Sequence, residues 1–511
     1  MDRFPTFSSR LVRVILTISG TLAWLCAAVT IRQGLTIASH SPLLWGVSAC
    51  GVLAGVVAFG VACGARDSAI HATAARLVDF LHRTGQVTPG PNDRRVGGGL
   101  VWWGCLLFAA NTLWVYQHQD TPFDDDQGAF LITALEIHDQ GGLSELWSDL
   151  WSGRFEESNR HPLLIAMQSL QPTVEFGRGL SCLLATLMLG LATAILWRRM
   201  GPLSAGVFAV LIGTNGAWLY HVPRLVCESL LTGIAGLAWL ALLTPALAPS
   251  TSSPQFSTLT PQRSAWLGVL LGLAYLTKGT GLLLFVGAVL AYGVIAIWSG
   301  STRRTTIVSA CVLILAFLVA ASPLLVRNQM RFGSPTYNVN SYLLWVDTYE
   351  SPNAMADRMT LPEARSAYLA THSATELIQR EATGLAWEAF IGLRTLGPAP
   401  WDDARLLFGL PLFALGLLGL CHMPGLPVLV LIFWTGIMWV TMAWYVPITA
   451  GDRFLMPLLI PWLALAANGL VQILSLSNDP RSASRRIMLG TILWGVVITV
   501  LVWTRAGLWA C

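Results

Sequence analysis

Long apolar runs separated by short polar connections dominate the chain. Each run is long enough, or nearly long enough, to cross a hydrocarbon core of ~30 Å as a helix. The runs lie at about 11–31, 43–63, 99–117, 176–197, 202–220, 225–247, 264–277, 279–298, 305–326, 406–421, 428–446, 454–474 and 487–504. Because an α-helix satisfies its own backbone groups in lipid, the pattern predicts an all-α polytopic membrane protein with about thirteen transmembrane helices. The first run has no small-residue cleavage signature before Arg32, so a retained span is expected there.

Composition supports the same class. Of the 511 residues, 54% are hydrophobic and 11% are charged, with a mean hydropathy of +0.61, whereas soluble domains carry roughly 25% charged residues. A chain this long and this poor in charge cannot cover a water-facing surface, which excludes a soluble enzyme of several domains. The nine cysteines have no zinc-type spacing. No basic run of the nucleic-acid-binding kind occurs, so that class of partner is also excluded.

The distribution of arginine predicts the orientation. We interpret 264–298 as two helices flanking Lys278, since a single helix would move every later loop to the other side. One side of the membrane then collects 16 arginines and five acidic residues, and the positive-inside rule makes it cytoplasmic. We therefore expect a plasma-membrane protein with a cytoplasmic N-terminus, an extracytoplasmic C-terminus, and two outer loops at 118–175 and 327–405 with short interfacial helices.

Three regions are expected along the chain. Residues 1–98 would hold two N-terminal transmembrane helices and a cytoplasmic linker, and residues 99–475 the transmembrane core with its outer loops. Residues 476–511 would form a cytoplasmic loop and the last transmembrane helix. In the second outer loop, helices at about 361–371 and 375–394 are expected to form a lid.

Three consecutive carboxylates, Asp124, Asp125 and Asp126, follow the third span at the predicted outer membrane edge. Packed together they repel one another, so at least one should have a raised pKa or bind a cation or proton. Such a cluster suits a general base or a divalent-metal site. Alternatively, Asp126 caps a helix that begins at Gln127. The residue types leave both interpretations open.

Two features of the same loop point to the membrane interface. Residues 143–151 form an amphipathic pattern that would lie on the outer leaflet, or would pack against the protein. Arg160 and His161 then precede Pro162 and an apolar stretch that re-enters the membrane. Two cations at this depth could hold a phosphate, or they could be a snorkelling arginine beside a surface histidine.

This loop resembles the catalytic loop of GT-C superfamily glycosyltransferases, namely the dolichyl-phosphate-mannose protein mannosyltransferases and the bacterial transferase that adds aminoarabinose to lipid A. Their pattern is roughly D-E-x-x-Y-x-x-x-A, a later glycine, and then H/K-P-P-L. The matching positions here are Asp126, Phe130, Ala134, Gly141, His161, Pro162 and Leu164. Gln127 replaces the acidic second residue, Phe130 the tyrosine and Leu163 the second proline. Because Asp125 and Asp126 could instead be the acidic pair, both stay candidates for the catalytic carboxylate.

Three further stretches match the same superfamily in the same order. G-L-A-Y-L-T-K-G-T-G (272–281) resembles its helix hairpin, S-P-L-L-V-R-N-Q-M-R-F-G-S-P (322–335) the start of its large outer loop, and D-R-F-L-M-P-L-L-I-P (452–461) the start of a late helix. The resemblance covers about residues 99–475. It implies that Lys278, Arg327 and Arg453 converge on a phosphate or pyrophosphate; dispersed, they would be interface anchors.

Arg224 and Glu228 are also candidates for substrate binding. They are four residues apart, which is one turn of a helix. Glu228 is the one acid placed inside a predicted span, and an intramembrane carboxylate is a functional candidate by default. The alternative is that Glu228 exists to pair with Arg224.

The resemblance implies a membrane glycosyltransferase that moves a sugar from a polyprenyl-phosphate donor to an acceptor at the extracytoplasmic face, with inversion. Asp126, or else Asp125, would be the base. The cations expected to stabilise the departing phosphate are Arg160, His161, Lys278, Arg327 and Arg453. The acceptor, whether lipid, glycan or protein, and a divalent metal at Asp124 are left open. The alternative is a transporter or lipid flippase for a cell-envelope glycolipid, which predicts mid-membrane charges and repeated halves that the sequence lacks.

Overall fold

The structure is a computed structural model that describes residues 92–118, 125–243, 260–298, 303–398, 402–423, 425–475 and 480–504. For Asp125, Trp298, 402–407 and 480–481 it describes the backbone alone. The spans predicted at 11–31 and 43–63 lie outside these residues, as does most of the first expected region. Over the described residues the chain is almost entirely helical, with one isolated β-bridge between Asn215 and Pro398. The prediction of an all-α fold is confirmed.

The helices follow one another without any intervening strand in the described segments. They are α4 (Asp93–His118), α5 (Asp125–Asp139), α6 (Gly142–Ser152), α7 (Pro162–Gln168), α8 (Val174–Arg199), α9 (Pro202–Gly213), α10 (Gly216–His221), α11 (Glu228–Leu240), α12 (Pro261–Thr277), α13 (Thr280–Trp298), α14 (Arg303–Phe332), η1 (Val339–Trp345), α15 (Pro352–Arg358), α16 (Leu361–Thr371), α17 (Ala374–Leu396), α18 (Asp402–Cys421), α19 (Leu426–Tyr445), α20 (Asp452–Leu455), η2 (Met456–Leu458), α21 (Leu459–Ser475) and α22 (Pro480–Thr504).

Many of these helices are built to cross a membrane. Within the described residues, 7 helices are long and apolar enough to do so, and three shorter apolar helices accompany them. Each apolar run predicted between residues 99 and 504 contains helix in its described part. The chain is therefore a multi-pass membrane protein, and the count of about thirteen spans stays a prediction.

The predicted break at Lys278 is present. α12 ends at Thr277, α13 begins at Thr280, and Lys278 between them has an extended backbone with φ −160° and ψ 148°. The run at 202–220, by contrast, is not one helix, because Asn215 ends it and starts α10. The Asn215 side chain accepts the backbone N–H of Trp218 at 2.9 Å and donates to the carbonyl of Thr395 at 2.9 Å.

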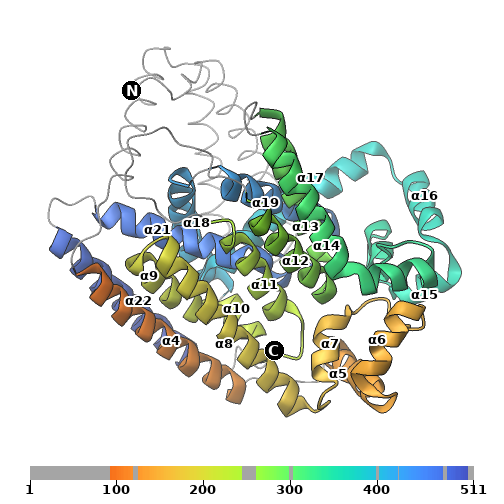
Figure 1. Cartoon of the computed structure of the whole chain (residues 1–511), viewed down its shortest axis with the longest axis horizontal. Coiled ribbons are helices and arrows are strands. Elements are labelled where there is room, and N and C mark those ends of the chain that lie inside the picture. The colour runs from red at the N-terminus through yellow and green to blue at the C-terminus, as the bar shows by residue number, and fades with distance from the viewer. Residues whose placement is uncertain are drawn as a thin grey trace, which may run out of the picture.

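Close backbone approach joins the helices of the bundle (Figure 1). α4 and α9 form the most extensive helix pair of the described residues. A Cβ atom added at Gly104 of α4 would lie 2.5 Å from the carbonyl carbon of Ala209, and one at Gly97 would lie 2.5 Å from that of Pro202. Small residues drive such contacts in membranes, where lipid tails are as apolar as side chains and packing must hold helices together.

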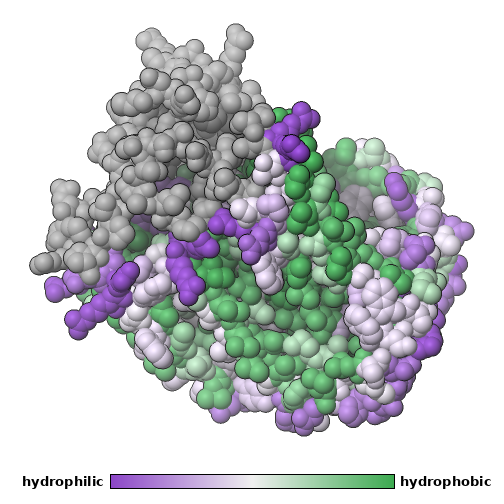
Figure 2. All heavy atoms as spheres, viewed as in Figure 1, coloured by the Kyte–Doolittle hydropathy of each residue, from purple (hydrophilic) through white to green (hydrophobic). Residues whose placement is uncertain are grey.

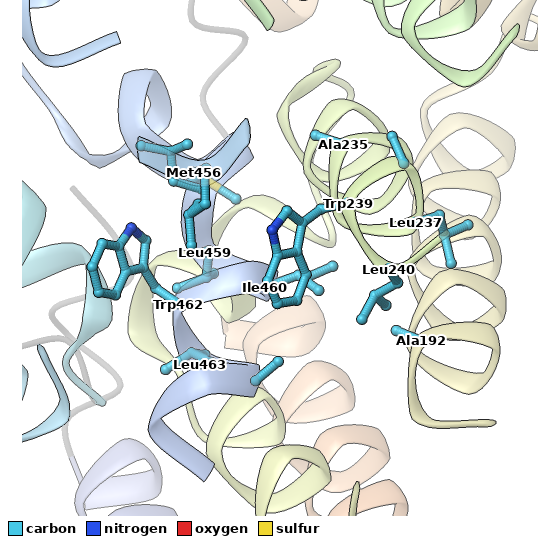
Figure 3. Packing of buried hydrophobic residues seen from close by; sticks show 14 of the residues in the cluster. Ala192, Ala235, Leu237, Trp239, Leu240, Met456, Leu459, Ile460, Trp462 and Leu463 are labelled. Carbon is cyan, nitrogen blue, oxygen red and sulfur yellow. The ribbon is translucent and has the colours of Figure 1, made fainter. Parts of the chain in front are cut away.

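A large apolar core lies where α11 meets α21. Trp239 of α11 is fully buried beside Ile460 of α21 (Figure 3), and its indole N–H donates to the carbonyl of Pro427 at 3.0 Å. On the face seen in Figure 2, the middle of the molecule is largely apolar, as expected of a lipid-facing surface. Since α20 and η2 lead directly into α21, this core supports the segment that carries Arg453.

Two groups of short helices lie beside the bundle (Figure 1): α5 to α7 from the first predicted loop, and η1, α15 and α16 from the second. On α6, Leu146 and Leu150 are buried, whereas Trp147 and Trp151 stay exposed. The amphipathic stripe of α6 is therefore divided between the protein interior and the outer surface.

The helices expected in the second loop form where they were predicted, behind capping boxes at Thr360 and Ser373. The C-terminal half of α17 is wedged between α18 and α19, and the expected role of these helices as a lid stays a prediction. A Cβ at Gly384 would overlap the carbonyl oxygen of Ala443, and one at Gly409 of α18 would overlap that of Leu393. This half of α17 belongs to the bundle.

Candidate active site

Asp126 and Arg453 meet at one end of the bundle. Asp126 lies in the first turn of α5 and Arg453 in α20, and Arg453 Nη1 donates to Asp126 Oδ2 at 2.6 Å. A hydrogen bond between two charged groups of this length is stronger than a neutral one. The two side chains remain 49% and 36% exposed, so a ligand can reach both partners.

A second ion pair lies within electrostatic reach of the first. Lys278 Nζ, at the break between α12 and α13, lies 2.9 Å from Glu228 Oε1 at the start of α11. Glu228 also interacts with Arg453, and the Phe454 ring is 5.5 Å from Lys278 Nζ and 5.0 Å from the Arg453 guanidinium carbon. Two ion pairs from four distant segments are thus linked, and the cation of each lies over the Phe454 ring.

The Glu228 carboxylate is only partly satisfied. Its residue is 5% exposed, and its second oxygen, Oε2, is buried with no hydrogen-bond partner. Glu228 therefore finds its cation in Lys278, whereas Arg224 donates to the hydroxyl of Tyr220 and lies 4.7 Å from the centre of that ring.

His161 ties three segments together. Its Nδ1 hydrogen-bonds the carbonyl of Tyr275 in α12, and Asn338 Nδ2 donates to its Nε2 at 3.3 Å. Burial lowers the pKa of His161, the bond to Tyr275 raises it, and the charges of Arg327 and Lys278 lower it again. The resulting pKa is about 4. The imidazole is therefore neutral near pH 7, with the proton on Nδ1.

Arg327 of α14 is a buried guanidinium. It is 2% exposed, it lies 5.3 Å from the ring centres of both Phe155 and Phe332, and its Nε and Nη1 atoms are buried without a hydrogen-bond partner. An unpaired buried charge costs several kcal/mol unless an opposite charge approaches it. The Arg327 site is therefore suited to an anion.

Arg160 already has an acidic partner. Its Nη1 lies 3.2 Å from Glu157 Oε2, and Glu157 Oε1 accepts the backbone N–H groups of Asn159 and Arg160. The phosphate-holding role expected of Arg160 and His161 stays a prediction. In this structure the charge of Arg160 is balanced, and His161 is neutral.

Gln127, which departs from the superfamily pattern, has a definite contact. Its side-chain oxygen accepts the backbone N–H of Leu225 at 3.1 Å. Gln127, which follows Asp126 in α5, thereby helps to fix the segment between α10 and α11.

Sequence reasoning missed three residues of this region. His221, at the end of α10, is buried and interacts electrostatically with Glu228, Arg224 and Arg453. Phe454 and Asn338 were likewise passed over. A histidine between two apolar runs is a usable signal, since such residues are rare near spans. Phe454 lies in the 452–461 stretch that matches the superfamily, whereas nothing in the local pattern marks Asn338.

The remaining candidates are not tested by the structure. Asp124 lies outside the described residues, and the side chain of Asp125 is not described. Among the residues that are described, no group of three or more His, Cys, Asp or Glu side chains could hold a metal ion. The metal role suggested for Asp124 stays open.

No protein-family model and no curated protein sequence matches this chain. Solved structures do resemble it. ArnT from Cupriavidus metallidurans bound to undecaprenyl phosphate is 15% identical, with a TM-score of 0.43 over 79% of this chain and 74% of ArnT. The apo state of the same ArnT is 13% identical, with a TM-score of 0.47 over 79% of this chain and 76% of ArnT.

A third similar structure is the archaeal oligosaccharyltransferase AglB from Archaeoglobus fulgidus, in complex with an inhibitory peptide and a dolichol-phosphate. It is 14% identical, with a TM-score of 0.42 over 79% of this chain and 56% of AglB.

Proposed function

We propose that the protein transfers a sugar from a polyprenyl-phosphate donor to an acceptor, and that the residues around Asp126 form its active site. The observation that carries this proposal is the meeting of Asp126, Arg453, Glu228 and Lys278, which come from four segments far apart in the sequence. A carboxylate reachable by solvent beside several cations is the arrangement that deprotonation of an acceptor and departure of a phosphate both require.

Asp126 would act as the general base. It removes the proton from the acceptor hydroxyl or amine, whose oxygen or nitrogen attacks the anomeric carbon. The bond from that carbon to the phosphate oxygen breaks, and polyprenyl phosphate leaves with the bonding electrons. A single displacement of this kind inverts the anomeric configuration. Asp125 is the alternative base.

Lys278, Arg453 and Arg327 would stabilise the departing phosphate. Arg453 pairs with Asp126, and a phosphate could compete for its guanidinium because the pair is partly exposed. Arg327 supplies two N–H groups that have no partner. His161 is within electrostatic reach of both Arg327 and Lys278, so these cations border one region.

The other predicted residues would shape this region. His161 joins the first loop to the α12–α13 break, and Arg160 braces the same loop through Glu157. Arg224 and Glu228 would contact the sugar or its phosphate. We further propose that the site opens at the extracytoplasmic face, with the N-terminus cytoplasmic, the C-terminus outside and the donor tail between helices.

A screen of purified protein against polyprenyl-phosphate sugars tests this function. The proposal predicts that at least one donor releases its lipid phosphate in step with a glycosylated acceptor. Movement of an intact glycolipid across a liposome bilayer, with no lipid phosphate released from any donor, would instead support the transporter or flippase alternative.

A further inference from the structure

Glu388 of α17 is a buried acid outside the cluster described above. It is 1% exposed, and both of its carboxylate oxygens are buried with no hydrogen-bond partner. An ionised carboxylate in such a place is strongly unfavourable unless a cation or a donor reaches it. The side chain is therefore expected to hold a proton near neutral pH.

The helices packed around Glu388 provide few charged groups that could stabilise an ionised carboxylate. α17 is pressed against α19 at Gly384, one helical turn before Glu388, and against α18 near Leu393. α19 contains no ionisable side chain except Tyr445 at its end, and α21 contains none. The described side chains of α18 include only Cys421, at its C-terminal end. α10, which also contacts α17, contributes Tyr220 and His221. The charged groups in electrostatic reach among the described residues are Asp452 and Arg394.

These two groups connect Glu388 to the proposed active site. Arg394 Nε lies 3.1 Å from Asp452 Oδ1, and Thr395 Oγ1 donates to the same oxygen at 3.2 Å. Asp452 is the first residue of α20 and directly precedes Arg453, the partner of Asp126. The C-terminal end of α17 thus anchors the short helix that presents Arg453.

Ionisation of Glu388 would disturb this anchor. A negative charge on Glu388 repels Asp452 and attracts Arg394, so it weakens the bond that holds the start of α20. Burial raises the pKa of Glu388, Asp452 raises it further, Arg394 opposes them, and the resulting value is about 7. The change in charge therefore falls in the physiological range.

We propose that Glu388 is a positioning residue: its neutral form leaves the anchor of Arg453 through Arg394 and Asp452 intact, and its ionised form disturbs that anchor. For its effect on the reaction this inference rests on the proposed function, but the effect on α20 does not. With a pKa of about 7, the neutral fraction of Glu388 falls from about 0.9 at pH 6 to about 0.1 at pH 8, a roughly ninefold change.

The test compares wild type with Glu388→Gln and Glu381→Gln. Gln cannot ionise and has nearly the same shape as a protonated Glu. Glu381 is a matched control on the same helix, because its pKa is also raised by burial but its charged neighbour is Arg380, away from Asp452. The first readout is hydrogen–deuterium exchange of residues 451–458, compared between proteins at each pH.

We expect wild type and Glu381→Gln to exchange several times faster than Glu388→Gln at pH 8, and all three to agree at pH 6. Equal exchange of all three proteins at both pH values would overturn the proposal. If Glu388→Gln does not fold, wild type is tested by itself. The proposal then requires protection of residues 451–458 to fall relative to that of 459–475 as pH rises from 6 to 8, and a constant ratio would overturn it.

The second readout is binding of undecaprenyl phosphate at the same pH values. We expect affinity to fall up to about ninefold from pH 6 to 8 in wild type and Glu381→Gln, and to stay flat in Glu388→Gln. If the lipid binds none of the proteins, the proposed function fails while the exchange result still stands. If it binds with the same pH dependence in all three, the positioning role of Glu388 fails alone.

Discussion

Arg327→Met separates binding from folding at the buried guanidinium. Met keeps much of the length of the arginine stem and removes the charge. In wild type, Nε and Nη1 are buried without hydrogen-bond partners, so the folded protein holds an incompletely hydrogen-bonded charge between the Phe155 and Phe332 rings. Replacing a buried charge by an apolar side chain of similar volume is often neutral or stabilising. The thermal midpoint of the variant should therefore match or exceed that of wild type.

Donor binding should respond in the opposite direction. A hydrogen bond to a charged group contributes about 1.5–3 kcal/mol, and each 1.4 kcal/mol is about tenfold in affinity. Losing even one contact between Arg327 and a phosphate should therefore weaken binding of undecaprenyl phosphate by about tenfold to about a hundredfold. Titration of purified protein with the lipid, in the same detergent for all variants, measures this.

Arg331→Met is the matched control for this experiment. Arg331 lies one turn further along α14, is exposed, and pairs with Glu156 at 2.7 Å. It should bind the lipid as wild type does. An unchanged affinity in Arg327→Met together with a clear fall in its thermal midpoint would refute the reasoning, since Arg327 would then be a structural residue.

Two further predictions concern orientation and pH. With reactive native cysteines replaced, a cysteine at Ser158 should react with an impermeant thiol reagent added outside intact cells and one at Ser301 should not; the reverse labelling would invert the topology. For Glu388, the folded-state pKa of about 7 lies above the ordinary 4.5, so the folded protein holds the extra proton. The contribution of Glu388 to the free energy of unfolding should be full below pH ~4.5 and should fall by about 3 kcal/mol as pH rises to about 7. Glu388→Gln should remove this contribution to the pH dependence in unfolding experiments.

Much of the fold follows from the sequence because lipid imposes a simple rule on apolar runs. The break at Lys278 was predicted from charge distribution alone, and the capping boxes at Thr360 and Ser373 mark real helix starts. The run at 202–220 was misread as one helix, because Asn215 ends it through hydrogen bonds to Thr395, far along the chain. A local pattern contains no information about such a partner.

The candidate site shows the same limit. The sequence singled out Asp126 and Arg453, but only their three-dimensional contact pairs them. Helical spacing suggested that Glu228 would pair with Arg224, whereas its bond is to Lys278, fifty residues away. Glu388 was not considered, since an acid in an apparently amphipathic loop helix looks solvent-exposed until α18 and α19 are seen to enclose it.

The most direct test of the central claim is single-turnover transfer by Asp126→Asn, with Asp125→Asn as the control for register. Asn keeps the shape and any capping bond of the aspartate but cannot accept a proton at neutral pH. General base catalysis typically contributes 10²–10⁴-fold. Release of lipid phosphate, with the donor found in the screen, should therefore slow by about that factor in Asp126→Asn, while donor affinity stays within a few-fold of wild type and Asp125→Asn remains active. Wild-type turnover by Asp126→Asn would contradict the account: if Asp125→Asn is then inactive the base is Asp125, and if both variants are active the proposed base is not in this cluster.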